Sequence, residues 1–220
     1  MCTLVVQYQP DADWPMLVAA NRDEQYGRTW EPPAAHWPER QEIVAPLDEL
    51  AGGTWFGVNR YGLVAAVANR PGTIGPQRGK RSRGELVLEA LEHADADTAI
   101  GALADLEPAA YRGFNLFVGG PTGAWWVAHR EDMAGMAVDT VPPGLHMLTS
   151  GELDDPGDAR IALNRPRFEA AEAPDPETGD WSGWESLLAD PEPRDERPET
   201  AMCLALDGFG TVCSHLAATP

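Results

Sequence analysis

The sequence lacks long hydrophobic runs. No apolar stretch approaches the roughly 20 residues that a membrane-spanning helix needs, so we expect no membrane span. The first residues show no charged segment followed by an apolar one, so we expect no signal peptide and a cytoplasmic location. The glycine-rich patterns of nucleotide-binding loops are missing as well, which leaves nucleotide binding without support.

Lysine is almost absent. A single lysine stands among 16 basic residues, against 35 acidic ones, and the formal net charge is −19. Such a charge repels nucleic acid and anionic membranes, so we expect neither as a partner. An acidic, lysine-poor surface is typical of cytosolic proteins from halophiles, because concentrated salt screens dense carboxylates. An ordinary acidic protein is the alternative interpretation.

Cysteine is scarce too, and the chain has only Cys2, Cys203 and Cys213. Their odd number and wide spacing argue against a disulfide framework, and no pair has the spacing of a zinc knuckle. The five histidines form neither a metalloprotease motif nor a haem-attachment motif. We therefore predict no metal site, and we expect neutral, hydrogen-bonded histidines, with His129 and His215 at the ends of strands.

What the sequence does contain is a series of short apolar segments separated by turn residues. Hairpins are predicted from strands 3–8 and 16–20 and over residues 54–69, 114–130 and 201–218. Helices are predicted over residues 85–94, 97–106, 156–171 and 182–189, and surface loops over 173–180 and 190–199. A capping box at Ser82–Glu85 would begin the first helix, and Pro166 would interrupt the third. This order favours an α+β fold of two packed sheets flanked by helices, in a single domain of residues 1–220.

The N-terminal segment MCTLVVQYQPDADWPMLVAANRDE raises the main question about function. Folding its hairpin about residues 11–12 brings Cys2 opposite Asn21–Asp23. Removal of Met1 would leave Cys2 with a thiol and a free amine, whose reference pKa of about 7.7–8.0 suits a built-in base near pH 7. The alternative is that Cys2 is a small buried hydrophobe and that the NRDE run is a solvated turn with a local ion pair.

In the nucleophile interpretation, the polar residues near Cys2 have separate tasks. Arg22 would lower the pKa of the thiol. Asp23 would hold either the terminal ammonium or the arginine in place. Asn21 or Asn69 would donate a hydrogen bond to a developing oxyanion.

Five motifs occur in a fixed order: MC, AANRDE, GGTWFGVN, RGEL and FNLFV. Together they resemble the NRDE-motif family that includes transport and Golgi organization protein 2, and the resemblance fades after about Gly151. It implies a four-layer αββα sandwich like that of N-terminal nucleophile hydrolases, with two mainly antiparallel sheets between helices. Animal members are implicated in haem trafficking, so the resemblance implies haem as a ligand, with no cofactor required.

A more distant resemblance is to penicillin V acylases and bile salt hydrolases, which also begin Met-Cys-Thr. It implies Cys2 as the nucleophile, Arg22 and Asp23 as its nearest partners, and Asn69 on the oxyanion side. Two departures stand out. Ser150 occupies the place of a further asparagine of those enzymes, and Val212 the place where the NRDE family often has an arginine.

The sequence therefore predicts an N-terminal-cysteine hydrolase or acyltransferase that acts on a carbon–nitrogen (amide) bond of a small molecule. We expect Asn21, Trp55 and Ser150 to contact the substrate, although a strand tryptophan is more often part of the core. The alternative is a non-enzymatic haem carrier on the same fold. A third interpretation, which the departures at Ser150 and Val212 favour, is a degenerate hydrolase fold with only an interaction role.

Overall fold

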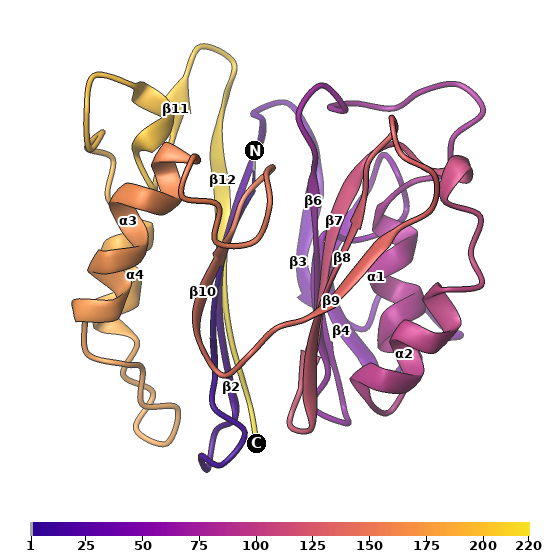
Figure 1. Ribbon diagram of the computed structural model, residues 1–220, viewed down its shortest axis with the longest axis horizontal. Coiled ribbons are helices and arrows are strands. Elements are labelled where there is room, and N and C mark those ends of the chain that lie inside the picture. The colour runs from indigo at the N-terminus through magenta and orange to yellow at the C-terminus, as the bar shows by residue number, and fades with distance from the viewer. Residues whose placement is uncertain (1) are drawn as a thin grey trace. The chain divides into compact units, whose positions relative to one another are not determined.

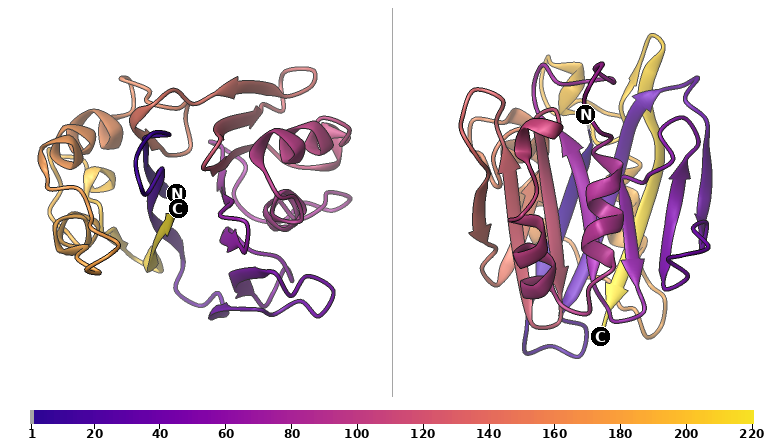
Figure 2. Two further views of the ribbon diagram at one scale, coloured as in Figure 1. Left: turned by 90° about the horizontal axis from the view of Figure 1, so that it is seen from below. Right: turned by 90° about the vertical axis from the view of Figure 1, so that its right-hand side faces the viewer.

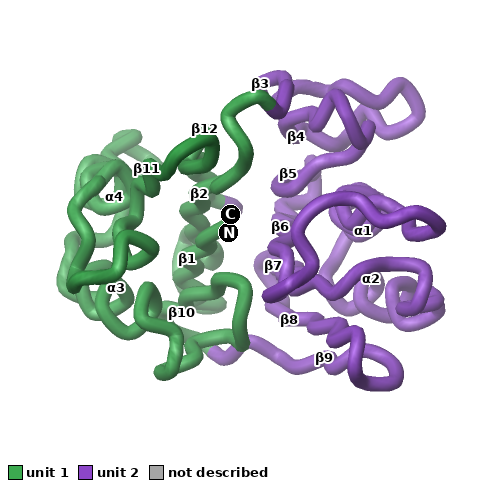
Figure 3. The backbone as a smooth tube through the Cα atoms, turned by 90° about the horizontal axis from the view of Figure 1, so that it is seen from above, with its two compact units in different colours: residues 1–27, 143–218 green, residues 28–142, 219–220 purple. Residues whose placement is uncertain are grey.

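A computed structural model describes residues 2–220 of the chain (Figure 1). Met1, and with it the predicted removal of that residue, lies outside the described residues. The chain divides into two compact units (Figure 3). Unit 1 combines the N-terminal segment up to Gly27 with Pro143–Ala218, and unit 2 combines Arg28–Pro142 with Thr219–Pro220.

Unit 1 is built on a five-stranded sheet with the order β10-β1-β2-β12-β11. Its strands are β1 (Thr3–Tyr8), β2 (Met16–Gln25), β10 (Gly144–Leu148), β11 (Ala205–Leu206) and β12 (Phe209–Thr219). Two helices, α3 (Ala159–Ala170) and α4 (Ser182–Leu188), lie along one face of this sheet (Figure 1). The core between helices and sheet includes Val5, Leu17, Ala19, Met147, Ile161, Phe168 and Trp184.

Unit 2 is built on a seven-stranded antiparallel sheet with the order β3-β4-β5-β6-β7-β8-β9. The strands are β3 (Trp30–Ala34), β4 (Ile43–Asp48), β5 (Phe56–Asn59), β6 (Val64–Asn69), β7 (Phe114–Gly120), β8 (Gly123–His129) and β9 (Ala137–Thr140). Helices α1 (Gly84–Leu91) and α2 (Ala96–Leu103) lie across one face of it (right view of Figure 2). Short 3-10 turns occur at Pro108–Ala110 in this unit and at Pro198–Thr200 in unit 1.

The predicted hairpins are confirmed by β1–β2, β5–β6, β7–β8 and β11–β12. One boundary was wrong, because β2 continues through the NRDE run to Gln25 instead of ending before it. Pairing with β1 reaches Asn21, and the side chains of Asn21 and Asp23 find buried hydrogen-bond partners. His215 also lies inside β12, although the sequence predicted it at a strand end.

The four predicted helices are confirmed, with ends that differ by a few residues. The predicted capping box is wrong: Arg83 is the N-cap of α1, and no side chain caps it. Glu85 instead forms an ion pair of 2.7 Å with Arg81, and Ser82 accepts a hydrogen bond from the Gly84 N–H. The predicted interruption at Pro166 is wrong, because α3 continues past Pro166 to Ala170.

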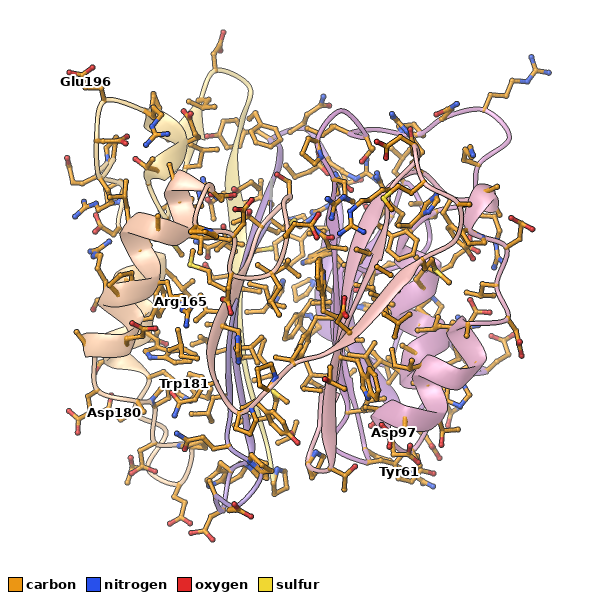
Figure 4. The ribbon with its side chains drawn as sticks, in the orientation of Figure 1. Tyr61, Asp97, Arg165, Asp180, Trp181 and Glu196 are labelled. Atoms are coloured by element: carbon orange, nitrogen blue, oxygen red, sulfur yellow. The ribbon has the colours of Figure 1, made fainter. Side chains whose placement is uncertain are left out.

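Strands β3, β4, β9 and β10 were not predicted, and two of them, β3 and β9, lack a buried apolar pattern. Strand β3 has the sequence WEPPA and is largely exposed, and β9 has the sequence AVDT. The predicted loops at 173–180 and 190–199 are confirmed, and Glu196 projects outward from the second one (Figure 4). Within residues 2–220, the structure holds no helix of the length and apolarity that a membrane crossing requires.

Candidate functional site

Side chains of β1 and β2 alternate between the two faces of the unit 1 sheet. On the face that carries α3 and α4, the Thr3 Oγ1 atom accepts a hydrogen bond of 2.8 Å from Nη1 of Arg160. On the same face, Nδ2 of Asn21 donates to the carbonyl oxygens of Leu188 and Met202, at 2.9 Å each. Cys2 directly precedes Thr3 and Arg22 directly follows Asn21, so the alternation of side chains places both on the face away from the helices.

The pairing of β1 with β2 sets Cys2 beside Arg22. Thr3 pairs with Asn21, so the residue before Thr3 lies opposite the residue after Asn21. This confirms the predicted placement of Cys2 opposite Asn21–Asp23. Cys2 is partly buried, and Arg22 is only 3% exposed.

The environment of Cys2 acts on its pKa in opposite directions. Burial raises the pKa of the thiol, and the negative charge of Asp23 raises it further. A hydrogen bond from the Asp23 main-chain N–H lowers the pKa, as does the positive charge of Arg22. The net direction is upward, so the resting thiol keeps its proton and would need a base to release it.

The Asp23 carboxylate contacts residues of α3 and β12. Its Oδ2 accepts a hydrogen bond of 2.7 Å from Nη1 of Arg160, and its Oδ1 accepts one of 2.6 Å from Oγ1 of Thr211. The side chain of Asp23 is 0% exposed and that of Arg160 is 1% exposed. Asp23 and Arg160 thus form a buried ion pair, and the expected role of Asp23 in holding the terminal ammonium or Arg22 stays a prediction.

A second thiol and an imidazole share the face that carries Cys2. In β12, Ser214 donates to Oδ1 of Asn21 at 2.6 Å on the helix side, so Cys213 and His215 point the other way. The Cys213 Sγ lies 3.4 Å from Nε2 of His215.

Burial raises the pKa of Cys213 to about 12 and lowers the pKa of His215 to about 4. The positive charge of Arg22 lowers the pKa of both groups. The pair is therefore a neutral thiol beside a neutral imidazole at pH 7. The lowered pKa of His215 agrees with the prediction of a neutral histidine.

The sequence reasoning missed this pair, although one signal was available. Two residues separated by one position on a strand share a face, and Cys213 and His215 have that spacing. What the sequence could not show is that β12 lies next to β2. That adjacency brings both side chains under the influence of Arg22.

The other predicted site residues are distributed over the two units. Ser150 follows β10 in unit 1 and is partly buried. Asn69 ends β6 in unit 2 and pairs with Phe114, a core residue beneath α1 and α2, so register places it on the helix side of that sheet. Trp55 lies in unit 2, 9% exposed, with its ring centroid 5.8 Å from that of Trp30.

Unit 2 contains a buried polar contact that the sequence did not single out. Asn115, from the FNLFV motif, is fully buried and pairs with Ala68 on the sheet face away from α1 and α2. Its Oδ1 accepts a hydrogen bond of 2.6 Å from Nη1 of Arg70. Among the residues that the structure describes, no group of three or more His, Cys, Asp or Glu side chains could hold a metal ion.

Two solved structures show the fold. An N-acylethanolamine-hydrolyzing acid amidase ortholog from Caenorhabditis elegans superposes with a TM-score of 0.59 over 86% of each chain, at 13% identity. A variant of the conjugated bile acid hydrolase from Clostridium perfringens gives a TM-score of 0.50 at 16% identity, over 88% of this chain and 69% of that one. The predicted α+β fold of the N-terminal nucleophile hydrolases is confirmed.

Sequence comparison gives the family. The transport and Golgi organization protein 2 homologs of Bos taurus and Homo sapiens are 32% and 33% identical to this chain over 125 residues. Those residues make up 53% of this chain and 44% of each relative, so the chain spans less than half the length of the curated relatives it matches. The family model described as Transport and Golgi organisation 2 matches residues 1–173. The chain therefore belongs to the Transport and Golgi organisation 2 family.

Proposed function

We propose that this protein is an N-terminal-cysteine hydrolase or acyltransferase that acts on an amide bond of a small molecule. The observation that supports the proposal is the β1–β2 register, which sets Cys2 beside Arg22 on the sheet face away from α3 and α4. The fold adds support, because one solved structure with this fold is named as a hydrolase of N-acylethanolamines, which are amides.

The chemistry begins with the removal of Met1, which gives Cys2 a free α-amine. The thiol proton passes to this amine while the sulfur forms a bond to the carbonyl carbon of the amide. Arg22 and main-chain N–H groups stabilise the negative charge of the tetrahedral intermediate. The carbon–nitrogen bond then breaks, and the leaving amine takes the proton.

The product of that step is a thioester on Cys2. Water attacks its carbonyl carbon and releases a carboxylic acid, or an acceptor amine attacks and forms a new amide. In both cases the sulfur leaves as thiolate and regains a proton. Because burial raises the pKa of the Cys2 thiol, the proton transfer to the amine is the step on which the nucleophile depends.

Thiol labelling tests the proposal directly. The protein is exposed briefly to a limiting thiol electrophile, its intact mass is measured, and the adduct is located by peptide mapping. We expect a chain without Met1 and a label on Cys2 ahead of Cys203 and Cys213. Cys203→Ser is the matched control and should label as the wild type does, whereas Cys2→Ser should lose the fast label. A retained Met1, or an inert Cys2, would contradict the proposal.

Substrate screening follows from a positive result. Amides with varied acyl and amine parts are incubated with the wild type and with Cys2→Ser, and released amines are quantified. We expect turnover by the wild type and none by Cys2→Ser. Addition of acceptor amines then separates hydrolysis from acyl transfer, since a transferase forms a new amide in preference to the free acid.

A haem carrier on the same fold is the second candidate. One observation favours it: a thiol and a neutral imidazole, Cys213 and His215, lie 3.4 Å apart on the face that carries Cys2, and both are ligand types for haem iron. A carrier predicts a saturable Soret band on haem titration. The band should be lost in His215→Ala or Cys213→Ser and kept in Cys2→Ala, whereas the hydrolase depends on Cys2.

A further inference from the structure

We propose that Arg160 of α3 is the positioning residue of the Cys2 site. Its guanidinium binds the side chains of Thr3 and Asp23, which directly follow Cys2 and Arg22 in the sequence. The inference rests on the proposed function of Cys2, and it names a residue far away in the chain that the N-terminal motifs do not include. Arg160 would act through its neighbours and does not touch the sulfur.

The contacts of Arg160 are short and almost completely buried. Nη1 donates to Thr3 Oγ1 at 2.8 Å and to Asp23 Oδ2 at 2.7 Å. Nε donates to the main-chain carbonyl of Glu199 at 2.6 Å, at the end of the loop at 190–199. One side chain therefore connects α3 to two adjacent strands and to the segment that leads into β11.

Because Thr3 and Asp23 follow Cys2 and Arg22, the contacts of Arg160 affect the position of the Cys2 site. Thr3 and Asp23 lie on the helix side of the sheet, and the residue before each of them lies on the other side. Holding the side chain of Thr3 or Asp23 in place therefore also sets the direction in which the preceding side chain points. The Asp23 main-chain N–H is in addition the hydrogen-bond donor to the Cys2 sulfur. A shift of the Asp23 carboxylate would move that donor as well as the Cα of Arg22.

Thr211 secures the second oxygen of the same carboxylate. Its hydroxyl donates to Asp23 Oδ1 at 2.6 Å and accepts a hydrogen bond from the Leu204 N–H at 2.8 Å. Both carboxylate oxygens of Asp23 are thus engaged, one by a charged donor and one by a hydroxyl. The strand ends that carry Cys2 and Arg22 are held from α3 and from β12 at once.

A purely structural role for Arg160 would have a different signature. A buried ion pair contributes little net stability compared with apolar residues of the same volume, whereas removing one partner leaves a costly buried charge. If Arg160 served stability alone, its loss would lower the free energy of unfolding without a specific change at Cys2. The test must therefore measure the properties of the Cys2 thiol and the global stability in separate experiments.

The Cys2 thiol can be observed by NMR in protein labelled with [3-13C]cysteine, with the Cys2 signal assigned from its loss in Cys2→Ser. Thr3→Val removes the acceptor of Arg160 at nearly constant shape, Thr3→Ser keeps it, and Arg160→Met removes the guanidinium. We expect Thr3→Val and Arg160→Met to shift the Cys2 resonance and its titration midpoint. Alkylation of Cys2 should slow by about tenfold or more, since small displacements of a reacting group have effects of this size. Thr3→Ser should behave as the wild type.

Arg167→Met is the matched control, because Arg167 lies on the same helix and forms an ion pair of 2.5 Å with Asp190. It should leave the Cys2 resonance, titration and alkylation rate unchanged. Denaturant unfolding of every variant separates global destabilisation from these local effects. If Arg160→Met fails to fold, Thr3→Val decides the question.

Two results would overturn the inference. One is a folded Thr3→Val or Arg160→Met protein with wild-type Cys2 resonance and titration. The other is an equal change in Arg167→Met. An inert Cys2 in the wild type would instead contradict the proposed function, and the NMR comparison would still report whether Arg160 positions the residue.

Discussion

His215 has a pKa of about 4, against an ordinary value of 6.5, because it is buried and because Arg22 is positively charged. Between those values the unfolded chain binds a proton that the folded chain does not. The free energy of unfolding should therefore fall as the pH is lowered from about 6.5 to about 4. At 1.36 kcal/mol for each pKa unit, protonation of His215 on unfolding lowers the free energy of unfolding by roughly 3 kcal/mol over this pH range.

His215→Gln isolates this contribution. Urea unfolding of the wild type and the variant at pH 7 and near pH 4.5 should show a larger loss of stability in the wild type, because the variant has no imidazole to protonate on unfolding. His93→Gln is the control and should keep the wild-type dependence on pH. An equal loss in the wild type and in His215→Gln would contradict the expected role of His215.

At the same scale, the sequence could place Cys2 opposite Asn21–Asp23 but could not identify the partner of Asp23. The two strands are neighbours in the sequence, so a hairpin brings Cys2 near the NRDE run, and the exact pairing comes from the structure. Arg160 lies 137 residues from Asp23. Nothing in the sequence of α3 indicates which strand it covers, because the contact arises only when the helix packs on the sheet.

Among the elements, two glycine motifs meet where the segment before β5 touches the start of α1. A Cβ atom on Gly53 would lie 2.8 Å from the carbonyl carbon of Gly84, and a Cβ on Gly84 would lie 2.8 Å from the main-chain N and O of Thr54. The Thr54 N–H also donates to the Gly84 carbonyl at 3.3 Å. The GGTW and RGEL motifs thus share one requirement, the close approach of two backbones.

Gly84→Ala should therefore destabilise unit 2. Because backbone atoms form the contact and cannot rotate away, we expect a loss of about 1–3 kcal/mol, as for other overpacked sites. Gly101→Ala is the matched control: Gly101 lies within α2, with nothing within 4 Å of its Cβ position. It should stabilise the protein by roughly 0.5–1 kcal/mol, since alanine favours helix interiors. Urea unfolding measures the change in the free energy of unfolding for both variants, and the two changes should have opposite signs.

The elements also show where local sequence patterns stop being informative. The NRDE run contains four polar residues and reads as a turn, yet it continues β2, because its side chains are satisfied by groups from α3, α4 and β12. Edge strands β3 and β9 are largely exposed and need no apolar pattern. Tertiary hydrogen bonds and sheet pairing determine that these segments form strands, and neither can be read from a single sequence.

For the whole molecule, the residues that match the family model do not include all of the residues near Cys2. The match ends at residue 173, so it includes Cys2, Arg22 and Arg160 but not β12. Strand β12 supplies Thr211, Cys213 and His215. The family region therefore supplies Cys2, Arg22 and Arg160, and the C-terminal strand adds Thr211, Cys213 and His215.

The net charge of −19 has a consequence for stability that belongs to no single residue. Like charges on a compact chain repel one another and destabilise it relative to the expanded, unfolded chain. Raising the ionic strength from about 0.01 M to about 1 M shortens the screening length from about 30 Å to about 3 Å. The urea midpoint should therefore rise with KCl concentration, and a flat or falling midpoint would contradict this.

A charge-reduced variant separates screening from other effects of salt. Glu49, Glu177 and Glu196 are exposed carboxylates on different loops, and replacing all three with glutamine lowers the net charge to about −16 without touching the core. The triple variant should unfold at a higher urea concentration than the wild type in low salt and gain less from added KCl. If salt instead acted by strengthening hydrophobic burial, both proteins would gain equally, since their buried apolar surfaces are the same.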